Sequence, residues 1–152
     1  MTEIEGIRDQ LERSFYRDAW HGAAVKEVLE GVSAEQARRR PIADAHSIWE
    51  LVLHMTTWKT VVLRRLEGDP MRDVPPDVDW PPVTAHDGPA WEAARTGLEA
   101  AHTALAAHVA TLGDQGLDQA PAPGTSTRYV LLHGVIQHDL YHAGQIAVLK
   151  KG

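Results

Sequence analysis

The chain has 152 residues, 43% hydrophobic and 24% charged, a composition that excludes intrinsic disorder and predicts one globular domain over residues 1–152. Its 21 acidic residues outnumber its 15 Lys and Arg residues, and the net charge of −6 argues against binding to nucleic acid or to an anionic membrane. There is no cysteine, which excludes disulfides, thiolate nucleophiles and cysteine-bound zinc. Without a signal-peptide pattern or an apolar run of roughly 18 residues, the chain is expected to be soluble and cytoplasmic.

Helical spacing of apolar residues and N-terminal capping patterns predict helices along the whole chain. The expected helices, in chain order, span residues 2–20, 23–31, 33–40, 47–66, 87–113 and 126–150. Ser33 with Gln36, and Ser47 with Glu50, have the spacing of capping boxes and mark two of the helix starts. No segment alternates as a strand does. The predicted fold class is therefore all-α, and the four longer helices indicate a four-helix bundle.

Residues 68–90 hold six of the nine prolines and show no apolar period, so they are expected to form a long crossover loop. Loops of this length inside compact domains are often functional. Trp80 lies within this segment and is a candidate for closing over a site.

The last predicted helix, residues 126–150, is apolar nearly all round. A helix that is hydrophobic on every side is expected to be buried on every side. It is predicted to be either the central helix of the bundle or a helix shared with a second subunit.

Histidine is frequent, with nine residues in the chain, and without cysteine the only other strong metal ligands are carboxylates. His138 and His142 lie one turn apart on one face of the last helix, the spacing that lets two imidazoles reach one metal ion. Hydrogen bonds to backbone or side-chain groups are the alternative, because unpaired polar rings among apolar residues cost a few kcal/mol. His54, at the edge of the apolar stripe of the 47–66 helix, is the best candidate for a third ligand.

Two segments stand out as motifs: residues 46–55, HSIWELVLHM, and residues 132–146, LHGVIQHDLYHAGQI. They resemble the second-helix and C-terminal signatures of the DinB-like superfamily of damage-inducible proteins. Residues 20–22, WHG, and residues 79–82, DWPP, are also similar to segments common in that superfamily. The resemblance covers essentially the whole chain. It implies a four-helix bundle with a crossover, usually a homodimer.

The resemblance also implies a metal site that takes one histidine from the second helix and two from the last, here His54, His138 and His142. Nickel, zinc or iron is the expected metal. Three protein ligands leave at least one coordination position for water or substrate, as in catalytic rather than structural sites. Because some members of the superfamily are transferases or isomerases that use small thiols, the resemblance implies a metal-dependent thiol S-transferase. The metal would lower the pKa of the thiol.

Two other functions stay open at this point. A metal-dependent hydrolase would use metal-bound hydroxide to attack an ester, amide or phosphoester. A non-catalytic, stress-associated metal-binding dimer would need no substrate at all. The residues themselves identify neither the metal nor a substrate.

Separate roles are expected for several polar residues within the motifs and for the other histidines. Gln145 is expected either to orient a ligand or to satisfy a neighbouring group. Asp139 is expected to accept a hydrogen bond from an imidazole of another helix, or to pair with an arginine or a helix end. Capping explains His46, and His133 lies about 140° around the helix from His138, too far to be a ligand. We expect the remaining histidines in loops or on the surface: His21, His86, His102 and His108.

Overall fold

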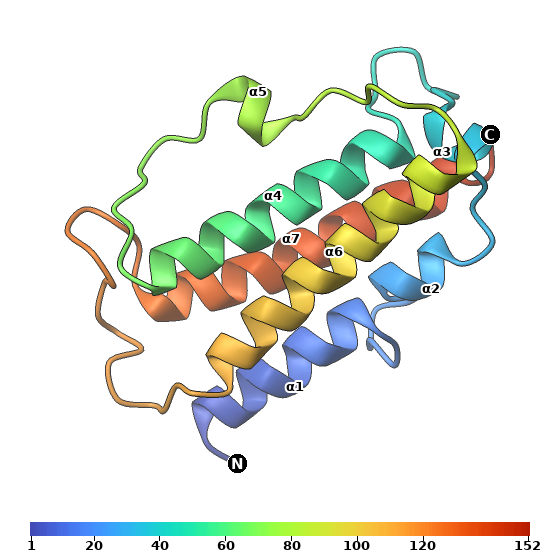
Figure 1. The fold of residues 1–152 in the computed structure, drawn as a ribbon. Coiled ribbons are helices and arrows are strands. Elements are labelled where there is room, and N and C mark those ends of the chain that lie inside the picture. Colours follow the sequence, from blue (N-terminus) through green and yellow to red (C-terminus); the bar gives the residue numbers. More distant parts are fainter.

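The computed structural model describes residues 1–152, and its seven helices and lack of strands confirm the all-α class. Four long helices lie side by side (Figure 1): α1 (Glu3–Phe15), α4 (Ile48–Leu66), α6 (Gly88–Val109) and α7 (Arg128–Leu149). Three helices are short: α2 (Val25–Leu29), α3 (Ala34–Arg38) and α5 (Pro76–Asp79). The longest helices are not apolar enough to cross a membrane.

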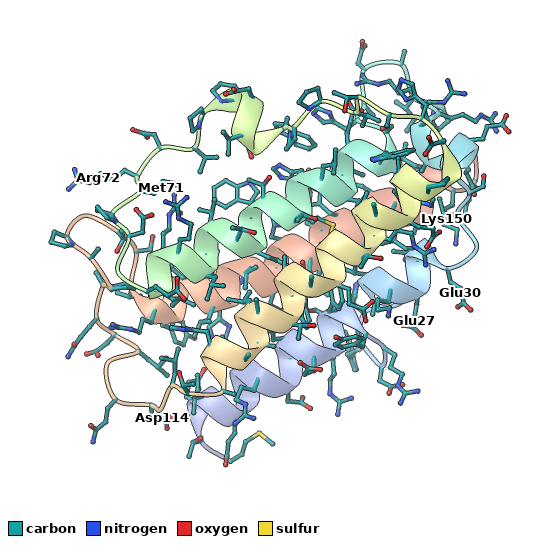
Figure 2. All side chains as sticks on the ribbon, viewed as in Figure 1. Glu27, Glu30, Met71, Arg72, Asp114 and Lys150 are labelled. Atoms are coloured by element: carbon teal, nitrogen blue, oxygen red, sulfur yellow. The ribbon has the colours of Figure 1, made fainter.

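The connection between α4 and α6 is the predicted crossover. Residues 67–87 pass along the outer side of α4 and return to the end where α4 began, so that α4 and α6 run in the same direction (Figure 1). The short helix α5 forms midway along this connection and was not predicted from the sequence. Arg65 ties the connection back to α4, because its guanidinium donates to the carbonyl oxygens of Met71 and Arg72 at 2.9 and 3.2 Å. Met71 and Arg72 lie in the part of the connection that follows α4 (Figure 2).

Side-chain caps fix where the site-bearing helices begin. The capping box predicted at the start of α4 is present: Ser47 Oγ accepts from the Glu50 N–H at 3.2 Å, and the Glu50 carboxylate accepts from the Ser47 N–H at 2.7 Å. At the start of α7, the Thr127 hydroxyl accepts from the Val130 N–H at 3.3 Å.

Two of the long helices are shorter than predicted. The first ends at Phe15 rather than near residue 20, because Asp18 has a left-handed backbone with a φ of 63°, which a right-handed helix cannot continue. The third long helix, α6, ends at Val109 rather than at residue 113. There the Thr111 hydroxyl donates to the His108 carbonyl at 2.7 Å and satisfies one of the terminal carbonyl groups.

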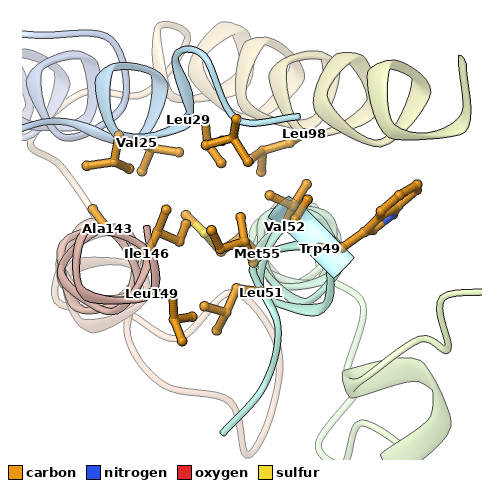
Figure 3. Packing of buried hydrophobic residues seen from close by; sticks show 14 of the residues in the cluster. Val25, Leu29, Trp49, Leu51, Val52, Met55, Leu98, Ala143, Ile146 and Leu149 are labelled. Carbon is orange, nitrogen blue, oxygen red and sulfur yellow. The ribbon is translucent and has the colours of Figure 1, made fainter. Parts of the chain in front are cut away.

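Apolar side chains hold α4 against α7. Leu51 and Met55 of α4 meet Ile146 and Leu149 of α7 (Figure 3), and each of the four is at most 5% exposed. Burial of one such side chain stabilises the fold by roughly 1.5–3 kcal/mol. This packing fixes the relative position of the two helices that carry the predicted histidine ligands.

The last helix is not buried on every side. Four of its apolar residues are between 45% and 66% exposed: Tyr129, Val130, Tyr141 and Val148. Of the two predicted alternatives, the central helix is therefore wrong, and the helix shared with a second subunit stays a prediction. One face of α7 enters the core, and another apolar face lies at the surface of the chain.

An ion pair lies in the interior between α4 and α7. Lys59 Nζ lies 2.6 Å from Asp139 Oδ2, and both side chains are completely buried. Burial raises the pKa of Asp139, and the neighbouring Lys59 ammonium limits that rise. The partner of Asp139 is thus a lysine, where the sequence led us to expect an imidazole, an arginine or a helix end.

His102 of α6 adjoins this pair and is also completely buried, so its predicted place at the surface is wrong. Lys59 Nζ donates to His102 Nδ1 at 3.3 Å, and the imidazole stacks on Phe15 with the ring centroids 3.9 Å apart. Burial, together with the charge of Lys59, lowers the pKa of His102 to about 3. The ring is therefore neutral in the folded protein at neutral pH.

Neutral burial of His102 makes stability depend on pH. The unfolded chain binds a proton at this residue with a pKa near 6.5, whereas the folded chain does so only near 3. Stability should therefore be full above pH 6.5 and fall as the pH is lowered from 6.5 towards 3, by up to about 1.4 kcal/mol per pH unit from this residue. Urea titrations should show a shallower dependence for His102→Gln and the wild-type dependence for the exposed control His21→Gln. Equal slopes for wild type and His102→Gln would contradict this assignment.

Candidate metal centre

Three imidazoles converge from α4 and α7. His138 and His142 lie one turn apart on α7, and His54 faces them from α4. The Nε2 atom of His138 lies 3.0 Å from Nε2 of His54 and 3.0 Å from Nε2 of His142. His54 and His142 are only 6% and 4% exposed. The structure thus brings together all three residues predicted as ligands, with ligand atoms within 4.8 Å of one another.

The far nitrogens of two of these rings have oxygen partners. His54 Nδ1 lies 2.8 Å from the carbonyl oxygen of Asp79 and 3.0 Å from its Oδ1 atom. His142 Nδ1 lies 2.6 Å from Gln145 Oε1. Because these oxygens accept hydrogen bonds, each Nδ1 carries the proton and each Nε2 presents a lone pair to the shared space. Of the two roles expected for Gln145, the structure shows a bond to a neighbouring side chain.

Burial keeps two of the rings neutral. Burial, with smaller contributions from His142, His54 and Lys59, lowers the pKa of His138 to about 3. Burial also lowers the pKa of His142, and the hydrogen bond to Gln145 opposes that shift. Near pH 7 both imidazoles are therefore uncharged, which is the state in which they bind metals.

Each Nε2 pair that includes His138 has the spacing of two ligands on one divalent ion. Nitrogens 3.0 Å apart can both lie at about 2.0–2.1 Å from the same ion, the usual zinc–nitrogen distance. The lone pairs of His54 and His142 both face the space next to His138 Nε2, where one cation could accept both of them. The cluster is therefore compatible with metal binding.

The crossover covers one side of the cluster, as the prediction for Trp80 required. The Trp80 indole stacks on His54 at 3.8 Å and on His46 at 3.5 Å between ring centroids, so it lies between the two imidazoles. Asp79 Oδ1 also accepts from Trp58 Nε1 at 2.7 Å. Asp79 was missed as a site residue, and its only signal in the sequence was its place in the DWPP segment. His46 stacks on Trp80 and does not act only at the helix start.

Two hollows border the cluster. A cavity of about 670 Å³ has His142 and Gln145 in its wall, together with Trp80. A smaller hollow of about 230 Å³ borders His138 on the other side, next to Trp58. Hollows therefore reach two of the three clustered histidines, one on each side of the cluster.

His133 does not join the three-histidine cluster. Its Nε2 atom lies 3.3 Å from Glu3 Oε1, and its ring lies 4.2 Å from that of Tyr129 between centroids. This agrees with the angle around α7 that placed His133 away from His138.

The chain was compared with protein families, with curated proteins and with solved structures. Neither the curated proteins nor the solved structures match it. The family described as the DinB superfamily matches residues 17–146, a range that includes all three clustered histidines and extends from the end of α1 into the last turns of α7. This match covers most of the chain and agrees with the resemblance carried by residues 46–55 and 132–146. The chain therefore belongs to the DinB superfamily.

Proposed function

We propose that the protein is a metal-dependent enzyme that transfers a small thiol to an electrophile. In this proposal His54, His138 and His142 hold nickel, zinc or iron. The observation that carries it is the convergence of three Nε2 atoms beside an accessible cavity. Three protein ligands leave room at the ion for a substrate. We infer a thiol as that substrate because some members of the superfamily use small thiols.

The metal, when bound, would supply positive charge that lowers the pKa of the thiol, so that a thiolate is present at neutral pH. Neighbouring residues of the chain orient the imidazole rings of the proposed ligands and shield them from water. Asp79 and Gln145 hold the Nδ1 protons of His54 and His142, which keeps the Nε2 lone pairs free. Trp80 covers the ring of His54 and excludes water from that side.

The surroundings of the cluster favour transfer over hydrolysis. Many metal-dependent hydrolases place a free general base beside the metal-bound water, in addition to the acidifying effect of the metal. Asp79 is engaged by Trp58 and His54, and Asp139 is buried against Lys59. Neither carboxylate is free to accept a proton from water at the cluster.

The test is to purify the protein without an affinity tag and to measure bound metals by mass spectrometry, next to the His138→Ala/His142→Ala variant. We expect near-stoichiometric metal in the wild type and none in the variant, with turnover of an aryl halide that requires both metal and an added thiol. No metal after incubation with nickel, zinc and iron would contradict the proposal.

Two other outcomes would favour the alternative functions. Thiol-independent cleavage of activated esters would favour the hydrolase. Bound metal without turnover would favour the non-catalytic dimer. The homodimer stays a prediction, which measurement of the mass in solution by sedimentation velocity would test.

Gln145 offers a test of the groups around the proposed ligands. Gln145→Leu removes the acceptor that lies 2.6 Å from His142 Nδ1, so the ring loses its fixed orientation and tautomer. We expect metal affinity to fall about 10- to 100-fold, measured by competition with a chromophoric chelator. The exposed Gln137 of the same helix is the matched control, and Gln137→Leu should bind metal as the wild type does. Equal affinities for the two variants would argue against this role of Gln145.

A further inference from the structure

The cavity beside the histidine cluster has the size and lining of a small-molecule site. Its volume of about 670 Å³ lies within the range of pockets that enclose one small ligand. Its apolar wall comes from Leu51 at the start of α4, from Tyr141 and Val148 of α7, and from Ile42 in the connection that precedes α4. Such a wall favours an apolar body over a polar one.

The charges around the cavity disfavour an anion. No lysine or arginine lines it, and Asp44 is the only acidic residue in its wall. The last turns of α7 form one side, and the C-terminal end of a helix carries partial negative charge. At the nearby start of α4, the Glu50 carboxylate already accepts from the Ser47 N–H. Away from the histidines, a negatively charged group would therefore find no lysine or arginine to balance its charge here.

Gly144 keeps the cavity open. It lies inside α7, where glycine lowers helix stability relative to alanine, and a Cβ atom built on it would meet no atom within 4 Å. Packing therefore does not require a glycine at this position. Gly144 lines the cavity, so a larger side chain would extend into the space that a ligand would fill.

We propose that this cavity binds the uncharged, apolar body of a small organic substrate, and that Gly144 sets the room for it. The polar end of the substrate points towards His142, which lies in the same wall. The position of the polar end rests on the metal-dependent function proposed above. The binding of the apolar body rests on the cavity alone.

Matched glycine variants separate this cavity from the rest of α7. Gly134 is also an exposed glycine within α7 with no atom within 4 Å of an added Cβ, but it lines the smaller hollow beside His138. Both Gly144→Leu and Gly134→Leu should be at least as stable as the wild type, because leucine favours a helix more than glycine does. A difference between them in ligand binding then reports on the cavity and not on folding.

The first experiment uses the protein as purified and after metal removal, with two ligands of the same shape, uncharged 4-phenylbutanamide and anionic 4-phenylbutyrate. In the metal-free wild type, the amide should shift the NMR signals of Gly144 and Gln145, and the carboxylate should bind at least 10-fold more weakly. Gly144→Leu should lose the binding of the amide, and Gly134→Leu should retain it. Equal binding of the two ligands, or no effect of Gly144→Leu, would overturn the proposal.

The second experiment uses the metal-loaded protein and compares acetohydroxamate with 4-phenylbutyrohydroxamate, which share a metal-binding head. Each methylene buried in the cavity should tighten binding about fourfold, and Gly144→Leu should abolish this gain without weakening acetohydroxamate. If metal and acetohydroxamate bind but the longer compound gains nothing, the cavity proposal fails and the metal centre stands. If no metal binds but the phenylbutanamide does, the metal-dependent function fails and the cavity proposal stands. A change of oligomeric mass in Gly144→Leu alone would show that a second copy of the chain fills this space, and would also overturn it.

Discussion

Lys59→Met should destabilise the folded protein by roughly 3–5 kcal/mol, because it leaves one charge of a buried ion pair without its partner. Lys59 Nζ lies 2.6 Å from Asp139 Oδ2, and water reaches neither side chain. The other carboxylate oxygen, Oδ1, has no hydrogen-bond partner that could compensate for the loss. Urea unfolding followed by circular dichroism measures the change in the free energy of unfolding.

Two controls distinguish this effect from a general sensitivity to substitution. The double variant Lys59→Met/Asp139→Leu removes both charges and should recover most of the lost stability, because apolar residues of similar volume often replace a buried pair without loss. Arg13→Met breaks the exposed pair with Asp9 on α1 and should have far less effect. Equal losses for Lys59→Met and Arg13→Met would contradict the importance of the buried pair.

Metal should stabilise the folded chain strongly if the three histidines bind it. At a free ion concentration about 1,000 times the Kd, the free energy of unfolding should rise by about 4 kcal/mol, since the unfolded chain does not hold the three rings together. Unfolding in urea with and without buffered nickel or zinc measures this gain.

His142→Ala should lose nearly all of the gain, because it removes one of the three convergent Nε2 atoms. His133→Ala is the matched control on the same helix, and it should keep the gain because His133 contacts Glu3 instead. A gain of equal size in wild type and His142→Ala would place the stabilising ion elsewhere on the chain.

The histidine cluster could be predicted because its signals are local or repeat along a helix. His138 and His142 are one turn apart, so their common face follows from helix geometry alone. His54 was predicted as a ligand from its place in the apolar stripe and from the resemblance to the superfamily. Asp79 could not be found in this way, because its position depends on the path of the crossover, which has no periodic pattern.

The buried ion pair was missed although the sequence contained a signal for it. Lys59 continues the apolar stripe that includes Met55 and Val62 of α4, and His102 continues the stripe of Leu98 and Leu105 on α6. Lysine is almost never fully buried unless it is paired, so composition favours the surface for it. Asp139, the partner of Lys59, could be identified only once the helices are packed, because the two residues lie 80 positions apart in the chain.

The wide separation of the cluster along the chain has a kinetic consequence. His54 lies 25 positions from Asp79 and 84 positions from His138, so the ligand atoms meet only when the crossover and the docking of α4 on α7 are complete. The entropy of closing such long loops is lost before the contacts form, and the close alignment of three Nε2 atoms is expected only after the main barrier to folding. Interactions absent from the transition state change the unfolding rate and leave the folding rate nearly unaltered. An ion held by the three histidines would therefore lengthen the lifetime of the folded chain without helping it to fold.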